Sequence, residues 1–234
     1  MPKKPKNKKY SKAVMDLTRF GFGPLLFMSY RPKYYYADGA PKRRKIEGRA
    51  IIVCNHVSFY DAFIVNLAWI RRRVHVLTHK NAVDSKKFHG RFLRKSGAIR
   101  IDPDLLDVSS FRSVIEYMNE EEVVAIFPEG HISPDGRLKS FQAGIFLTAV
   151  KGNAPVIPMY ISLPLRLRTT HVYIGKPITP AEAAEEAQKT GEKPAAALSR
   201  LVFGVMSGFE REYLEMRGRK KKRRGQNGTD NKKI

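Results

Sequence analysis

Cysteine is nearly absent from this sequence, and so are long uncharged apolar runs. The 234 residues include a single cysteine, Cys54, which excludes an internal disulfide framework and a cysteine-rich metal site. Because Cys54 lies inside an apolar run, we interpret it as a small packed thiol. No run of about 18 uncharged apolar residues occurs, so no membrane-spanning helix is expected. Residues 13–19 are too polar for the apolar core of a secretory signal peptide.

Acidic residues are also scarce: 22 Asp and Glu face 44 Lys and Arg, which gives a formal net charge of +22. Residues 1–12 hold six lysines and no acid, and residues 217–234 hold nine basic residues and one acid, so these ends carry +14 of the total. We expect both ends to be disordered tails that bind a polyanion, either an anionic membrane surface or a nucleic acid. Tails that only add solubility are the alternative.

Residues 13–36 differ in character from the tail before them. Apolar residues alternate there with charged residues, glycine and proline, and aromatic and basic residues follow at 30–36. The segment is too interrupted to span a bilayer, so we expect an amphipathic helical segment that lies in the membrane interface, with an aromatic boundary. A helix packed on the body of the protein is the alternative.

The remaining body, residues 37–216, predicts one α/β domain. Short apolar runs predict strands at 50–54, 74–78, 97–101, 123–127, 155–161 and 171–174. Helical periodicity covers 60–70, 88–94, 108–118, 141–150 and 180–216, with a break near 191–194. Fully apolar strands between helices are typical of a mostly parallel sheet that is flanked by helices.

Two of the predicted strands end in polar residues. Asn55 and His56 follow the strand at 50–54, and the sequence Phe-Pro-Glu-Gly occupies 127–130. Because ligands bind at the carboxyl ends of parallel strands, we expect both turns to open on one edge of the sheet. His56 is the predicted general base, and Asp61 is the carboxylate that orients its ring.

The residues around His56 favour direct activation of a substrate hydroxyl. A metal site is disfavoured because the other histidines show no metal-ligand spacing; they are His75, His79, His89, His131 and His171. No Gly-x-Ser-x-Gly sequence supplies a serine nucleophile. We expect Ser58 or Asn55 to cap the next helix, Glu129 to accept hydrogen bonds from hydroxyl groups, and Gly130 to let the backbone approach the ligand.

These motifs resemble those of the glycerolipid acyltransferases typified by 1-acylglycerol-3-phosphate acyltransferase. Residues 55–61 match the family's Asn-His-x-Ser/Thr-x-x-Asp block, and residues 127–130, which include Phe127 and Pro128, match its Phe-Pro-Glu-Gly block. Residues 97–102 and 156–158 resemble two further blocks, and order and spacing agree over residues 45–180.

The resemblance implies that His56 activates a lysolipid hydroxyl, which attacks the thioester of acyl-CoA or acyl-carrier protein. The acceptor would be 1-acyl-glycerol-3-phosphate and the product phosphatidic acid, in phospholipid biosynthesis. It also implies a monotopic N-terminal anchor, and hence a peripheral protein on the cytoplasmic face of a membrane. No cofactor or metal is expected. Backbone amides at the start of the helix after His56 are expected to stabilise the thioester oxyanion.

The sequence departs from the family at two positions that bind the acceptor phosphate. Pro103 and Ile132 stand where the family has arginines. The candidate substitutes are Arg100, His131, Arg137 and Lys139, and surface charges are the alternative reading of each. A non-phosphate acceptor, such as an aminolipid or glycolipid hydroxyl, therefore stays open. A basic nucleic-acid-binding protein and a catalytically silent lipid-binding module are more distant alternatives.

Overall fold

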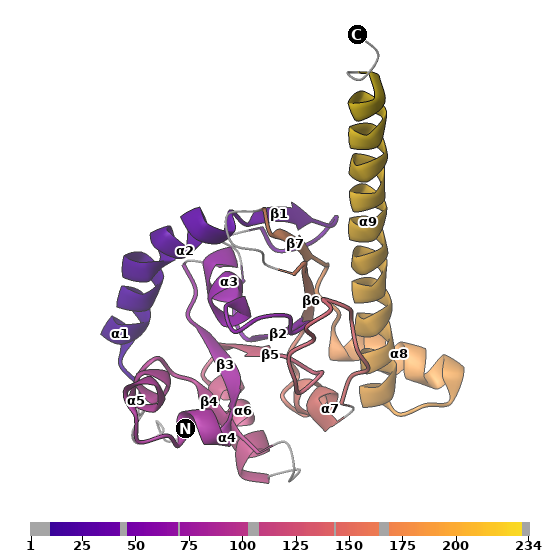
Figure 1. Cartoon of the computed structure of the whole chain (residues 1–234). Helices are drawn as coiled ribbons and strands as arrows, with labels where there is room; N and C mark the ends of the chain where they lie inside the picture. The colour runs from indigo at the N-terminus through magenta and orange to yellow at the C-terminus, as the bar shows by residue number, and fades with distance from the viewer. Residues whose placement is uncertain are drawn as a thin grey trace.

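The chain folds around a seven-stranded sheet with the strand order β1-β7-β6-β2-β5-β3-β4 (Figure 1). The computed structural model describes residues 10–42, 46–69, 71–102, 108–142, 144–163 and 169–230, and the side chains of these residues except 108–110 and 220–230. The strands are β1 (Lys33–Tyr36), β2 (Ala50–Cys54), β3 (Val74–His79), β4 (Ile99–Ile101), β5 (Val123–Ile126), β6 (Val156–Ile161) and β7 (His171–Ile174). Neighbouring strands are parallel, except that β6 and β7 pair antiparallel.

Helices cover both faces of this sheet. They are α1 (Lys12–Leu17), the π-helix η1 (Thr18–Phe22), α2 (Gly23–Tyr30), α3 (Asp61–Ala68), α4 (Lys80–Val83), α5 (Phe88–Lys95), α6 (Val108–Asn119), α7 (Gly144–Lys151), α8 (Pro180–Thr190) and α9 (Pro194–Asp230). Side chains alternate along β2, so Ile52 packs with α3 on one face while Ile51 packs with α6, α7 and α9 on the other. The predicted class, a mostly parallel α/β sheet flanked by helices, is confirmed.

The predicted strands and helices are present, with ends that shift by a few residues, and the break between α8 and α9 is where the sequence predicted it. Strand β1 was not predicted. The sequence reads residues 30–36 as an aromatic membrane boundary, whereas Lys33–Tyr36 pairs with β7 at the edge of the sheet. Tyr34 and Tyr36 pack against the core there. The aromatic residues of β1 are therefore part of the folded body.

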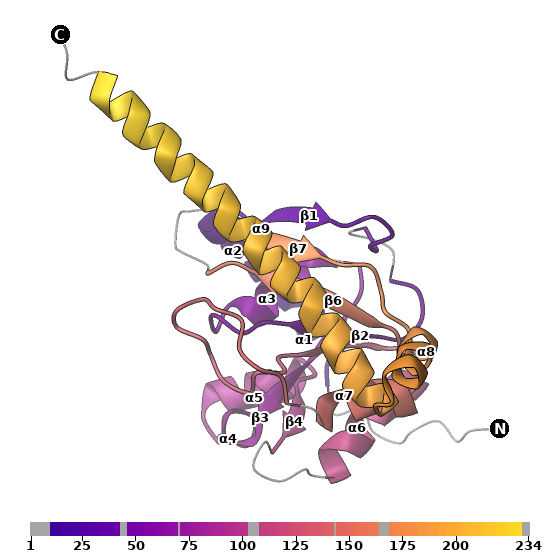
Figure 2. The same cartoon turned by 90° about the vertical axis from the view of Figure 1, so that its right-hand side faces the viewer.

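The C-terminal helix is longer than the sequence suggests. Helix α9 continues to Asp230 and extends beyond the body (Figures 1 and 2), although residues 217–234 were predicted to be disordered. Lys and Arg are good helix formers, so a basic run does not oppose a helix that packing has already started. Residues 231–234, and residues 1–9 of the other predicted tail, lie outside the described part of the chain.

The N-terminal helices lie along one side of the body, opposite α9 (Figure 1). They present large apolar side chains to the outside, each more than half exposed: Leu17, Phe20, Phe22, Leu25 and Met28. We call these five residues the N-terminal apolar patch. No helix in the described part of the chain is long and apolar enough to cross a membrane.

Gly97, which leads from α5 into β4, packs against the buried His75. Its φ is +75°, and a Cβ there would lie 2.6 Å from Nδ1 of the buried His75. Gly191 has a similar φ of +72° with open space around it. Gly191→Ala is expected to lower the free energy of unfolding by about 1–2 kcal/mol through backbone strain alone. Gly97→Ala is expected to cost a further 1–3 kcal/mol or so through the clash.

Urea denaturation of the two variants measures this difference. Equal losses in both would show that His75 and its neighbours relax around the added methyl group.

Candidate active site

Asn55 fixes the chain where β2 ends. Its side chain is fully buried, its Nδ2 donates to the carbonyl oxygen of Ile161 at 2.9 Å, and its Oδ1 accepts from the Ile161 amide at 2.7 Å. These two bonds join the exit of β2 to the end of β6. Asn55 therefore fixes the backbone that carries His56. The prediction that Asn55 caps the next helix is wrong, because its side chain bonds to Ile161 instead.

His56 and Asp61 form the expected dyad. Nδ1 of His56 lies 2.9 Å from Oδ2 of Asp61, which is fully buried at the first residue of α3. The side chain of His56 is 21% exposed. A carboxylate that accepts the Nδ1 proton leaves Nε2 of the ring to take a proton from a bound group.

The same carboxylate oxygen holds the turn between these two residues. The amides of Val57 and Ser58 each donate to Oδ2 of Asp61 at 2.7 Å. These two amides are therefore not available to an oxyanion, and the prediction for the amides at the start of α3 stays a prediction. Ser58 does not cap α3 either; its hydroxyl accepts from the amide of Tyr60 inside the turn at 3.1 Å.

The turn after β5 meets the turn after β2, as expected. The ring of Phe127 stacks on the ring of His56, with 4.3 Å between centroids and 18° between planes. The amide of Ser133 donates to the carbonyl oxygen of His56 at 2.6 Å. Gly130, at φ +74°, allows a close approach, since a Cβ there would lie 2.5 Å from the side-chain nitrogen of Gln142.

Glu129 is a buried acid in this turn. It is 2% exposed, and its Oε1 accepts from the amide of Lys139 at 3.3 Å. Its Oε2 has no hydrogen-bond partner among the described residues. Burial raises the pKa of Glu129 to about 7, against the hydrogen bonds and the charge of Lys139 that lower it. Near neutral pH the group can both donate to and accept from a bound hydroxyl.

The candidate phosphate-binding cations lie apart from the dyad or already have partners. Nε of Arg100 is 2.8 Å from Asp84, Nζ of Lys139 is 2.9 Å from Asp135, and Arg137 approaches Glu210 at 3.8 Å. His131 is exposed. Pro103 lies outside the described residues, and Ile132 is partly buried.

Lys80 was not singled out in the sequence. It follows β3 directly, at the same edge of the sheet, and its Nζ lies 2.6 Å from Oδ2 of the buried Asp102. The sequence does show a lysine directly after an apolar strand. It does not show that this strand, β3, lies next to β5, which is what places Lys80 at the edge of the sheet that carries the candidate site.

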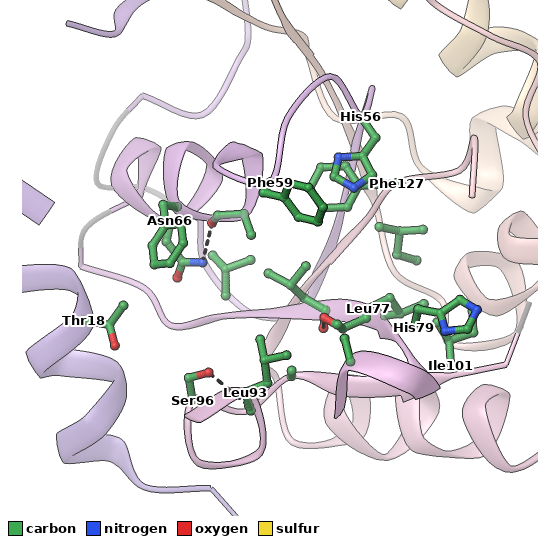
Figure 3. Close-up of a pocket in the computed structure, with 18 of the residues that line it drawn as sticks. Thr18, His56, Phe59, Asn66, Leu77, His79, Leu93, Ser96, Ile101 and Phe127 are labelled. Carbon is green, nitrogen blue, oxygen red and sulfur yellow. Dashed lines mark hydrogen bonds between the residues drawn. The ribbon is translucent and has the colours of Figure 1, made fainter. Parts of the chain in front are cut away.

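An apolar pocket of about 360 Å³ starts at His56 and Phe127 (Figure 3). Its wall is built by α3, β3, α5, β4 and the N-terminal helices, and apolar side chains dominate it. Gly130 lines it, whereas Arg100, His131, Arg137 and Lys139 do not. The sequence did not predict this pocket, because its walls come from segments that tertiary packing brings together.

The raised pKa of Glu129 predicts a pH-dependent stability. Its pKa is higher in the folded chain than the ordinary value of 4.5, so the protonated form favours folding, and this contribution is lost as the pH rises from about 4.5 through 7. Glutamine at this position does not titrate, so Glu129→Gln removes this loss. Relative to the unchanged protein, the free energy of unfolding of the variant is therefore expected to be more favourable at pH 8 than at pH 5, by about 1–3 kcal/mol.

Urea denaturation at the two pH values measures this. Glu192→Gln is the matched control, since hydrogen bonds from Thr190 and Arg200 lower the pKa of this partly exposed acid. The same change with pH in both variants would contradict the assignment to Glu129.

The chain is similar in sequence to known acyltransferases. The 1-acyl-sn-glycerol-3-phosphate acyltransferase of Bacillus subtilis is 30% identical over 109 residues, which cover 46% of this chain and 53% of that protein. The enzyme of that name from Limnanthes alba is 32% identical over 117 residues, or 49% of this chain and 41% of that protein. The chain thus matches about half the length of these relatives or less.

A solved structure shares the fold. The 1-acyl-sn-glycerophosphate acyltransferase PlsC of Thermotoga maritima superposes with a TM-score of 0.61 at 21% identity, covering 86% of this chain and 78% of that one. The protein family described as Acyltransferase matches residues 31–162, more than half of the sequence. The chain belongs to this acyltransferase family.

Proposed function

We propose that the protein is an O-acyltransferase that moves a fatty acyl group from a thioester, acyl-CoA or acyl-carrier protein, to the hydroxyl of a lysophospholipid. The observation that carries this proposal is the His56–Asp61 pair at the start of an apolar pocket. The names of the relatives support 1-acyl-glycerol-3-phosphate as acceptor and phosphatidic acid as product, in phospholipid biosynthesis.

In this mechanism Nε2 of His56 takes the proton of the acceptor hydroxyl as its oxygen attacks the thioester carbonyl. Asp61 stabilises the imidazolium that forms, because its carboxylate bonds to Nδ1. The tetrahedral intermediate then breaks its carbon–sulfur bond, and the leaving thiolate receives the proton from His56. The products are the acyl ester and the free thiol, and no covalent acyl-enzyme forms.

The dyad lies between an apolar region, which binds the acyl chain, and a polar region, which binds the acceptor. The apolar pocket holds the acyl chain, whose burial there is favourable by roughly 0.8 kcal/mol per methylene. Glu129 and Gly130 follow Phe127 in the same turn and bind the acceptor. Oε2 of Glu129, which has no hydrogen-bond partner among the described residues, bonds to a hydroxyl of the acceptor, and Gly130 lines the pocket where the two substrates meet.

A second acceptor class is favoured by a specific observation. Arg100, Arg137 and Lys139 are each close to an acid, so a phosphate would have to compete with Asp84, Glu210 or Asp135. The alternative is an O-acyltransferase for a non-phosphate acceptor, an aminolipid or glycolipid hydroxyl. Transfer rates to acceptors with and without a phosphate, matched in their acyl chain, separate the two.

Loss of the dyad is expected to abolish transfer without unfolding the protein. His56→Ala should lower kcat/KM about 10²- to 10⁴-fold, because general-base catalysis contributes that much. Asp61→Asn keeps an oxygen for the three donors but loses the charge that stabilises the imidazolium, so it should lower kcat. The double variant should be no slower than His56→Ala, since both residues act in one step.

Release of free thiol from acyl-CoA in the presence of each acceptor measures these rates. Glu185→Gln, which removes an exposed carboxylate on α8 away from the pocket, should keep full activity. Transfer by His56→Ala at the rate of the unchanged protein would refute the mechanism.

We further propose that the protein is peripheral and monotopic on the cytoplasmic face of an anionic membrane. The N-terminal apolar patch supplies a surface for the interface, and basic residues of α9 supply attraction to anionic lipid. Phe59, 84% exposed, lines the pocket, and the neighbouring Tyr60 contacts Tyr30 of α2 at 4.9 Å between ring centroids. The pocket thus borders the proposed membrane side.

The patch gives a direct test of this proposal. Phe22→Gln together with Leu25→Gln is expected to lower partitioning onto anionic liposomes at least about 10-fold, because each apolar side chain contributes roughly 1.5–3 kcal/mol when buried. Both residues are more than half exposed, so the fold should persist. Co-sedimentation measures partitioning, and Leu147→Gln on α7, 42% exposed, is the control. Unchanged sedimentation of the double variant would remove the patch from the membrane contact.

A further inference from the structure

Arg19 is a buried cation in the wall of the apolar pocket. It is 6% exposed and lines the pocket together with its neighbour Thr18. Among the described residues, its Nε and Nη2 have no hydrogen-bond partner, and its Nη1 makes a long contact of 3.4 Å with Asp16. Burial lowers the pKa of Arg19, with Asp16 opposing this effect. A buried guanidinium with unused donors destabilises the fold unless something else satisfies them.

Asp16 does not neutralise Arg19 by itself. The other oxygen of Asp16 accepts from Arg73 at 2.6 Å, so one carboxylate faces two guanidinium groups. Among these three side chains the charge is +1. Arg73 does not line the pocket. Nε of Arg73 also lacks a hydrogen-bond partner among the described residues, but of the two cations only Arg19 lines the pocket, so only Arg19 can meet a group bound there.

Three other polar side chains that line the pocket each donate one hydrogen bond to the backbone of their own segment. Thr18 donates to Val14, Asn66 to Ala62 and Ser96 to Leu93, in each case to a backbone carbonyl of the preceding turn. Their oxygens keep lone pairs for a further hydrogen bond. Arg19 thus offers donors to the same pocket to which these three side chains offer acceptors.

The three acceptor side chains lie away from His56 within the pocket. Figure 3 shows Thr18, Asn66 and Ser96 on the side opposite His56, with apolar side chains between them. Thr18 and Arg19 belong to η1, a π-helical turn between α1 and α2. Such turns often mark functional sites, because the inserted residue redirects side chains.

We propose that this end of the pocket is a polar subsite that recognises an oxygen on the acyl chain, and that Arg19 determines this specificity. The substrate class is an acyl thioester whose chain carries a hydroxyl group at or near its distal end. A hydroxyl accepts from Arg19 and donates to the oxygen of Thr18, Asn66 or Ser96, whereas a plain methyl end leaves Arg19 unsatisfied. The inference rests on the proposed function, in which the pocket holds the acyl chain.

The test compares acyl-CoA thioesters of equal carbon number with and without a terminal hydroxyl, over a series of chain lengths. At the length where the hydroxyl reaches Arg19, the unchanged protein is expected to prefer the hydroxyacyl thioester about 10- to 100-fold in kcat/KM, as a hydrogen bond to a charged group provides. Arg19→Met, which keeps the length of the side chain, should abolish the preference, measured as the ratio of kcat/KM for the two thioesters.

Two further variants separate recognition from stability. Arg73→Met removes the other cation that pairs with Asp16 but does not touch the pocket, so it should keep the preference. Arg19→Lys keeps a cation without the planar fork and should retain part of it. If Arg19→Met does not fold, Arg19→Lys takes its place in the comparison of hydroxyacyl and plain thioesters. No preference at any chain length, or a full preference in Arg19→Met, would overturn the inference.

Binding distinguishes failure of the inference from failure of the proposed function. Calorimetric titration of the unchanged protein and of Arg19→Met with free hydroxy fatty acids and plain fatty acids needs no acyl transfer. If no thioester is consumed, the proposed function fails, and tighter binding of the hydroxy acid that depends on Arg19 still supports the subsite. Equal binding of both acids would refute it.

Discussion

The catalytic end of this molecule depends on one buried carboxylate oxygen. Oδ2 of Asp61 accepts from the His56 ring and from the amides of Val57 and Ser58. A buried carboxylate without partners is strongly unfavourable, whereas each hydrogen bond to a charged group contributes about 1.5–3 kcal/mol. The three donors therefore hold the turn and orient the base together. Folding of the turn and assembly of the dyad are the same event.

The neighbouring strands fix this turn from both sides. Asn55 joins it to β6 through Ile161, and the Ser133 amide, with the stacked Phe127 ring, joins it to the segment after β5. Strands β6, β2 and β5 are adjacent and parallel, so their carboxyl ends reach the same edge. A site built on three adjacent strands is rigid, which suits a base that must meet two substrates in a fixed geometry.

The sequence predicted the features that interactions between nearby residues determine. The apolar run at β2 and the five-residue spacing of His56 and Asp61 were sufficient for the strand and the dyad, because both are settled within one turn of chain. The role of Asn55 was not predictable, since its partner Ile161 lies 106 residues along the chain. Strand β1 is four residues long and starts with an exposed lysine, so only its pairing with β7 makes it a strand.

The N-terminal helices show why the pocket also escaped the sequence. Their apolar residues suggested an outward face, and the structure places Leu17, Phe20 and Phe22 outside. The same segment turns Thr18, Arg19 and Gly23 inward to line the pocket, with the α2 backbone close to α3, since a Cβ at Gly23 would lie 3.1 Å from Leu67. One segment therefore serves two surfaces. From the sequence alone, a charged residue in an amphipathic segment is assigned to the polar, solvent-facing side. The structure shows instead that Arg19 is buried and lines the pocket.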